Sequence, residues 1–201
     1  FPKQLTVIAC DIWKEEDIQN AAGKVKEKYK KIDFLLNSSG ILNLEQKGET
    51  NLSQVHADSV LAAYKTNALG PLLMGKHFSS LLHHTRVEKG MYTGVIANIS
   101  ARVGSIGDNK QGGWYAYRAS KAAQNMITKT MSIELYAKQV LCVGLHPGTV
   151  NTSFSERYHK NVKHNINEPD EVVNYFCNVI GGLKMDDSGK YLDFNGKEIP
   201  W

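Results

Sequence analysis

Cysteine is scarce in this sequence, and no two cysteines are spaced as a C-x-x-C pair. Cys10, Cys142 and Cys177 each stand alone among apolar residues. This pattern argues against a disulfide framework and predicts reduced thiols, which suit a reducing compartment such as the cytoplasm or an organelle matrix. The seven histidines show no ligand spacing, so we predict no metal site. The compartment itself stays unknown, because we expect any targeting region to lie outside the given sequence.

Long apolar runs and a strong charge of one sign are also lacking. No run reaches 18 apolar residues, so no membrane-spanning helix is predicted. The formal net charge is only +4, and the lysines are interspersed with acidic residues, as in KVKEKYKK (24–31). This distribution argues against nucleic-acid binding. With 201 residues, 42% of them hydrophobic, the chain is long enough to form one globular domain with a core of its own.

Short apolar runs alternate with helical patterns along the chain. The sequence predicts strands at 5–11, 32–40, 93–100, 139–146 and 189–194, and helices at 14–31, 54–67, 70–86, 115–138 and 168–180. This alternation predicts an α/β fold, with a parallel sheet between two layers of helices. Ligands of such folds bind beyond the carboxyl ends of the strands. Polar and glycine residues follow four of the predicted strands: Asp11, NSSG (37–40), SARVGS (100–105) and PGTVNT (147–152).

The segment YAYRASK (115–121) places Tyr117 and Lys121 four residues apart at the start of the longest predicted helix. Residues at this spacing share a helix face. A nearby ammonium lowers the pKa of a phenol, so the pair could transfer a proton near neutral pH. The plainer interpretation is an aromatic residue at a helix start beside a solvated lysine, because this spacing is common by chance.

Further motifs make the sequence resemble the short-chain dehydrogenase/reductase family over nearly its whole length. NSSG (37–40) stands where that family has Asn-Asn-Ala-Gly, and YRASK (117–121) matches its Tyr–Lys motif. CDI (10–12), KTNALGP (65–71) and HPGTVNT (146–152) match three other family segments in order. The loop 100–123 and the ending GKEIPW are similar to the C-factor-like branch, especially its plant or algal members. The resemblance implies a Rossmann-like doubly wound parallel sheet.

The resemblance also implies residue roles and a cofactor, NADP or NAD, with NADP slightly preferred. Tyr117 would be the acid/base, and Lys121 would lower its pKa and bind the nicotinamide ribose. Asn67 would hold a water in the proton relay, although a helix kink is the alternative role. The other implied cofactor contacts are Asp11 and Ile12 at the adenine, Asn37 and Gly40 at the ribose, and Pro147, Gly148, Thr149, Val150 and Thr152 at the carboxamide or phosphates.

The chain departs from the family pattern where a catalytic serine is expected. Ala101 occupies that place, and counting back from Tyr117 by the common spacing leads to Gly104; neither side chain can donate a hydrogen bond. Strand alternation should point Ser100 the other way. Ser105, in the loop, is then the expected substitute donor. Loss of one donor to a developing oxyanion costs about 3 kcal/mol.

The second departure concerns the beginning of the chain. The family's Gly-rich turn and its first two strands have no counterpart here, and FPKQL shows neither an initiator Met nor a signal-peptide pattern. We therefore expect residues 1–201 to be the C-terminal portion of a single Rossmann-type short-chain dehydrogenase domain. A sheet without these strands should expose an edge.

Three functions follow from these observations. The first is an NAD(P)-dependent oxidoreductase acting on a carbonyl or secondary alcohol, with the 151–167 segment as a lid over a small-molecule substrate. The second, favoured by Ala101, is a non-catalytic family member serving as an accessory or structural subunit of a larger assembly. The third, another Rossmann-like enzyme such as a methyltransferase, would leave the Tyr–Lys and Pro-Gly-Thr motifs without a role. The apolar stripe of 115–138 fits either ordinary core or a homodimer.

Overall fold

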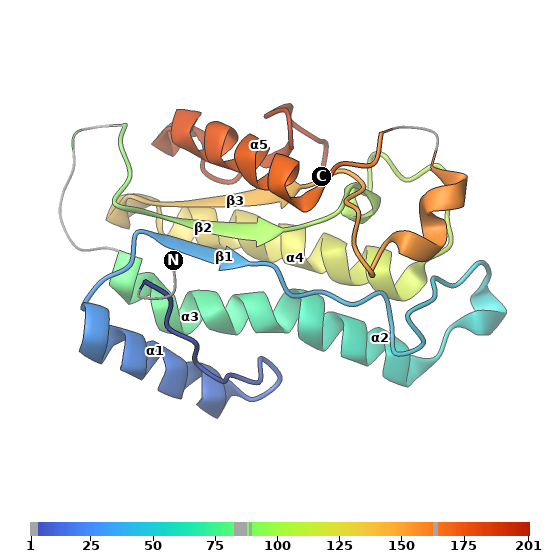
Figure 1. Ribbon diagram of the computed structural model, residues 1–201, viewed down its shortest axis with the longest axis horizontal. Coiled ribbons are helices and arrows are strands. Elements are labelled where there is room, and N and C mark those ends of the chain that lie inside the picture. Colours follow the sequence, from blue (N-terminus) through green and yellow to red (C-terminus); the bar gives the residue numbers. More distant parts are fainter. Residues whose placement is uncertain (1–3, 83–87, 89, 163–164) are drawn as a thin grey trace.

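A computed structural model describes residues 4–82, 88, 90–162 and 165–201. Its sheet contains four parallel strands in chain order (Figure 1): β1 (Phe34–Asn37), β2 (Gly94–Ile99), β3 (Val140–His146) and β4 (Tyr191–Asp193). β2 and β3 are almost wholly buried, as expected for apolar strands that are covered on both faces. The predicted parallel sheet is confirmed, and the carboxyl ends of its strands lie along one edge.

Helices cover both faces of the sheet (Figure 1). α1 (Glu15–Tyr29), α3 (Gly70–Leu82) and α4 (Tyr115–Glu134) pack on one face, and α5 (Pro169–Gly182) packs on the other. β2 shows the alternation that produces two cores, because Ile96 faces the first set of helices whereas Val95 and Ala97 face α5. The predicted α/β fold with two helical layers is therefore confirmed.

The predicted strand at 5–11 is wrong. This segment is extended and unpaired, with Ile8 and Cys10 packed against the core, while Leu5 and Val7 are 71% and 84% exposed. A strand needs a neighbouring strand for its backbone groups, and no described strand lies beside this segment. The segment thus has the apolar pattern of a strand but forms no hydrogen-bonded ladder with a described strand. β1 forms the sheet edge, and the predicted exposure appears there in Phe34 and Leu36.

The exposed edge at β1 leads to a first prediction. Residues 1–201 expressed alone should self-associate, because an open strand edge flanked by apolar side chains pairs readily with another chain. Phe34→Lys should reduce this association, whereas Leu52→Lys, at an even more exposed apolar residue in a 3-10 turn away from the sheet, should not. Sedimentation over a range of concentrations measures the effect. A monodisperse monomer with a sharp thermal unfolding transition would contradict this expectation.

The two helices predicted at 54–67 and 70–86 form one continuous helical segment over 57–82. α2 (Ala57–Tyr64) runs into a π-helical turn at Lys65–Leu69, and α3 follows directly. Pro71 has no N–H to give to the carbonyl four residues earlier, on Asn67, and a widened turn accommodates that loss. Asn67, for which a helix kink was the alternative role, lies within this π-helical turn. The end of the predicted helix, 83–86, lies outside the described residues.

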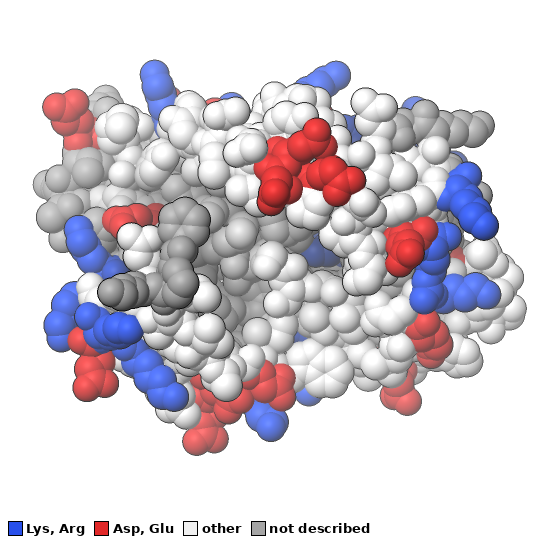
Figure 2. All heavy atoms as spheres, in the orientation of Figure 1, with Lys and Arg blue, Asp and Glu red and all other residues white. Residues whose placement is uncertain are grey.

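The other predicted elements lie within a few residues of their expected bounds, and α5 begins with Pro169 at its first turn. Among the described residues, no helix is both long and apolar enough to span a membrane. Basic and acidic side chains are interspersed over the face drawn in Figure 2.

Candidate active site

Tyr117 and Lys121 lie on the buried face of α4, near the carboxyl ends of the strands. Tyr117 is 8% exposed and Lys121 is 3% exposed. The Lys121 Nζ atom is 5.8 Å from the centre of the Tyr117 ring. The predicted sharing of one helix face is confirmed, and neither residue is a solvated surface group.

Burial dominates the electrostatics of this pair. It raises the pKa of the Tyr117 phenol and lowers the pKa of the Lys121 amine to about 7. The prediction that Lys121 lowers the pKa of the phenol is wrong for this structure, because a desolvated amine is itself only partly charged near neutral pH. Tyr117 therefore holds its proton, and it can act as a proton donor.

Asn67 joins the loop after β1 to α4. Its Oδ1 accepts a hydrogen bond from the Ile41 N–H at 2.9 Å, and its Nδ2 donates to the Ile41 carbonyl at 2.8 Å and to Ser120 Oγ at 2.9 Å. A Cβ on Gly40 would lie 3.3 Å from Asn67 Oδ1 and 3.7 Å from Lys121 Nζ. The structure thus brings together the predicted residues Gly40, Asn67 and Lys121. Asn67 thus uses both Nδ2 hydrogens and one acceptor site of Oδ1 to hold the loop after β1 against α4, and its predicted role in holding a water stays a prediction.

A cavity of about 100 Å³ lies beyond the end of β1. Two residues predicted to contact the cofactor, Ile12 and Asn37, line it together with Ser38, Ser39 and Gly70, among others. The Asn37 side chain turns inward and donates to Asn98 Oδ1 at 2.8 Å. Asp11 is not among the lining residues; its carboxylate accepts the Trp13 N–H at 3.0 Å and lies 3.7 Å from Lys14 Nζ.

The predicted cofactor segment 147–152 leaves β3 at the same sheet edge. Gly148 has φ +74°, and a Cβ there would lie 2.9 Å from the Phe194 ring, so the turn requires glycine. The Asn167 N–H donates to the Thr149 carbonyl at 2.9 Å, and Val150 forms a parallel bridge with Asn167. Thr152 Oγ1 donates to the Val150 carbonyl at 3.4 Å. Pro147 begins this turn, which lies at the same sheet edge as the site.

The residues around the missing serine cannot replace it. A Cβ on Gly104 would lie 2.7 Å from Lys121 Cβ and 2.9 Å from the Lys121 carbonyl carbon, so the close approach to α4 excludes a side chain. Ser100 Oγ donates to Asn125 Oδ1 at 2.6 Å in the core, which confirms that it points away. Ala101 has extended backbone angles and is partly buried.

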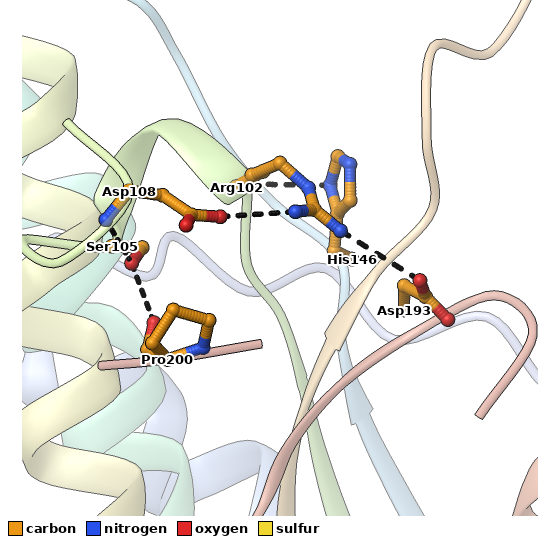
Figure 3. Close-up of polar contacts among 6 residues, drawn as sticks. All are labelled: Arg102, Ser105, Asp108, His146, Asp193 and Pro200. Carbon is orange, nitrogen blue, oxygen red and sulfur yellow. Dashed lines mark hydrogen bonds and ion pairs between the residues drawn. The ribbon is translucent and has the colours of Figure 1, made fainter. Parts of the chain in front are cut away.

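The Ser105 hydroxyl is hydrogen-bonded within its own loop and to the end of the chain (Figure 3). It is 1% exposed, its hydroxyl donates to the Pro200 carbonyl at 2.5 Å, and it accepts the Asp108 N–H at 3.1 Å. The Gly107 N–H donates to the Trp201 carbonyl at 3.0 Å. The Ser105 hydroxyl therefore ties the loop to Pro200, and its predicted role as donor, which stays a prediction, would require this bond to break.

A charged clamp that sequence reasoning missed holds the same loop (Figure 3). Arg102 Nη1 donates to Asp108 Oδ2 at 2.9 Å, and Nη2 lies 3.7 Å from Asp193 Oδ2 on β4. The Arg102 main-chain N–H donates to His146 Nδ1 at 3.3 Å, at the end of β3. The clamp therefore anchors the residue after Ala101 to two strand ends. Opposite charges at 102 and 108 were the only sequence signal for it.

Aromatic residues cover Tyr117, and sequence reasoning missed them as well. The Tyr117 ring lies 6.2 Å from the Trp114 ring and 5.7 Å from the Phe154 ring, and Trp114 lies 4.8 Å from Tyr158. We call Trp114, Phe154 and Tyr158 the aromatic roof. Phe154 and Tyr158 belong to the predicted lid segment. The site is thus apolar above the phenol.

The backbone around Trp114 is arranged to hold the roof. Trp114 has φ +51°, a left-handed conformation that is rare for a bulky residue. Its N–H donates to the Glu49 carbonyl at 2.6 Å. A Cβ on Gly48 would lie 2.4 Å from the indole Nε1, and the Gly48 N–H donates to the Tyr158 hydroxyl at 2.9 Å. Three distant segments therefore meet above Tyr117.

Comparison with known proteins identifies the family of this chain. The family model described as short chain dehydrogenase matches residues 2–163. The chain belongs to the short-chain dehydrogenase family. It is 33% identical over 170 residues to C-signal of Myxococcus xanthus, covering 85% of this chain and 93% of that protein, in agreement with the predicted C-factor-like branch.

Two further relatives connect this short-chain dehydrogenase chain with redox enzymes. It is 28% identical to 1-hydroxy-2-glutathionyl-2-methyl-3-butene dehydrogenase of a Rhodococcus species, over 95% of this chain and 78% of that protein. Among solved structures, NADPH-bound carbonyl reductase from chicken fatty liver superposes with a TM-score of 0.84 and 29% identity. That match covers 99% of this chain and 78% of the reductase.

Proposed function

We propose that this protein transfers a hydride between NADP or NAD and the carbonyl carbon of a small molecule. The observation that carries the proposal is the buried phenol of Tyr117, which keeps its proton and lies on one helix face with Lys121. In the reducing direction, Tyr117 gives its proton to the oxygen that becomes negative as the hydride arrives. The NADPH-bound relative favours NADP over NAD.

The described residues fit the two ends of such a dinucleotide. The cavity lined by Ile12 and Asn37 suits the adenine or ribose, and Gly40 leaves the approach to Lys121 clear. Lys121 would hold ribose hydroxyls, and the turn at Gly148 would hold the carboxamide. The Gly-rich turn that carries a pyrophosphate has no counterpart in this sequence. The nucleotide, when bound, supplies the hydride.

The proposed substrate is an apolar carbonyl compound. The Trp114 and Phe154 rings lie beside the proton donor and Tyr158 packs on Trp114, so a planar apolar group can stack there next to its carbonyl. The roof also leaves the phenol almost inaccessible, so the segment with Phe154 and Tyr158 must lift for entry.

A substrate panel tests the proposed function. We expect NADPH to be oxidised in the presence of aldehydes, aryl ketones, diketones or quinones, followed by its absorbance, and NADH to be oxidised more slowly. Lys121→Ala should lower the rate and weaken nucleotide binding, because the amine is proposed to contact both. Absence of turnover on the whole panel, together with no binding of either nucleotide, would contradict the proposal.

Ala101 supports a second candidate function, a non-catalytic accessory or structural subunit. Close contact with Lys121 leaves no room for a side chain at Gly104, and the Ser105 hydroxyl is bonded to the Pro200 carbonyl, which supports this function. Nucleotide binding without turnover would distinguish this function from the first. A homodimer is a further proposal, since Leu61 on α2 and Met126 and Ile133 on α4 are 63%, 67% and 70% exposed.

A further inference from the structure

Gln124 is a fully buried amide one turn after Lys121 on α4. Its Oε1 accepts a hydrogen bond from Lys121 Nζ at 3.0 Å. The same amine donates to the Ile99 carbonyl, at the end of β2, at 2.6 Å. Gln124 and the strand end thus hold the amine from two sides, and a hydrocarbon side chain at 124 could supply no such contact.

Burial of the Nε2 group of Gln124 costs free energy. Its Nε2 has no hydrogen-bond partner among the described residues. An unpaired buried amide destabilises the folded state, whereas an apolar residue of similar size would not. Packing alone therefore does not explain a glutamine here, and the contact with Lys121 provides a reason.

Gln124 also belongs to a polar layer that crosses the core. Asn37 Nδ2 donates to Asn98 Oδ1, Asn98 Nδ2 donates to Thr128 Oγ1, and Thr128 Oγ1 donates to the Gln124 carbonyl, each at 2.8 Å. These residues are all buried. The layer links the backbone of this turn of α4 to β1 and β2, and it makes no bond to the amide group of the Gln124 side chain.

The other neighbours of Lys121 contribute little to stabilising the charge of its amine. The Tyr117 ring faces it from α4, Gly40 from the loop after β1, and Gly104 from the turn after β2. No carboxylate forms an ion pair with it among the described residues. Two oxygens, on Ile99 and Gln124, are thus the groups that stabilise its charge. Burial alone lowers the pKa of this amine to about 7.

We propose that Gln124 is a positioning residue that holds the Lys121 amine against β2 and stabilises its charged form. The importance of this contact for catalysis rests on the proposed function. Its effect on the position and charge of Lys121 does not. Glutamine suits the task because its amide can present Oε1 to an ammonium or Nε2–H to the neutral amine, so that the lysine can change its charge. A carboxylate would keep the lysine charged instead.

Direct titration of Lys121 tests the proposal without any enzymatic assay. The protein is labelled with lysine carrying ¹³C at Cε, and the Lys121 signal is assigned by its absence in Lys121→Met. Gln124→Met should lower the Lys121 pKa, with about a tenfold change in the protonation constant, because a charge-assisted bond is lost. Gln124→Glu should raise the pKa by at least as much. A merely structural role would not shift the two variants in opposite directions.

Thr128→Val is the matched control. It removes both hydrogen bonds of the Thr128 hydroxyl in the same polar layer with almost no change in shape, and Thr128 makes none of the bonds to Lys121. Its Lys121 protonation constant should stay within a factor of two of wild type. An unchanged constant in Gln124→Met, or an equal shift in Thr128→Val, would overturn the proposal. If Gln124→Met does not fold, the upward shift in Gln124→Glu decides.

A pH–rate profile separates this inference from the proposed function. If NMR shows the opposite shifts and no substrate is turned over, the positioning role stands and the proposed function fails. If carbonyl reduction occurs, the midpoint of its lysine-dependent limb should move with the NMR constant in each variant. Turnover with an unmoved midpoint would overturn the positioning role.

Discussion

Replacing Tyr117 with phenylalanine should lower kcat for carbonyl reduction by about 10²- to 10⁴-fold, the usual contribution of a general acid. Phenylalanine keeps the ring that packs against Trp114 and Phe154 and removes only the hydroxyl. The fold and the nucleotide affinity should therefore stay nearly unchanged. Steady-state rates at saturating NADPH measure the first effect, and nucleotide titration measures the second.

Tyr115→Phe provides the control for this substitution. Tyr115 begins the same helix two residues earlier, is 38% exposed, and loses the same hydroxyl. Its rate should equal that of wild type. If Tyr117→Phe also retains a rate within a few-fold of wild type, the phenol is not the proton donor.

The strands and helices with simple apolar patterns could be predicted from the sequence. The run at 93–100 is buried on both faces, and the helix over 115–138 shows one buried stripe, so local pattern and tertiary environment agree. The run at 5–11 has the same local pattern without a neighbouring strand. Strand formation depends on a partner that no local pattern reveals, and this explains the error.

The candidate site was predictable where a motif determines geometry and not where distant segments meet. Helical spacing was enough to place Tyr117 and Lys121 on one face. The pKa of each group follows from burial, which is a property of the whole fold. The bond between Ser105 and Pro200 could not be predicted because Pro200 lies 95 residues along the chain. The aromatic roof likewise joins residues that no spacing rule connects.

Ala101→Ser should raise the rate of carbonyl reduction by about tenfold to a hundredfold, with little change in nucleotide affinity. Ala101 has φ −146° and ψ 139°, which serine adopts without strain. Because Ser100 points into the core toward Asn125, alternation places the side chain at 101 on the opposite side. The clamp at Arg102 holds this backbone to two strand ends, so a new hydroxyl would be preorganised.

Two comparisons make the Ala101→Ser experiment decisive. Ala119→Ser, the same change at an exposed position of α4, should leave the rate unchanged. Ser105→Ala should lower the free energy of unfolding by about 1–2 kcal/mol, because the Pro200 carbonyl and the Asp108 N–H lose their partner, while kcat stays close to wild type. An active enzyme whose rate is unaffected by Ala101→Ser would show that residue 101 does not face the substrate oxygen. If Ser105→Ala instead lowered kcat a hundredfold at unchanged stability, the donor would be Ser105 after all. If neither wild type nor Ala101→Ser turns over any carbonyl, yet both bind nucleotide, the balance shifts to the accessory-subunit function.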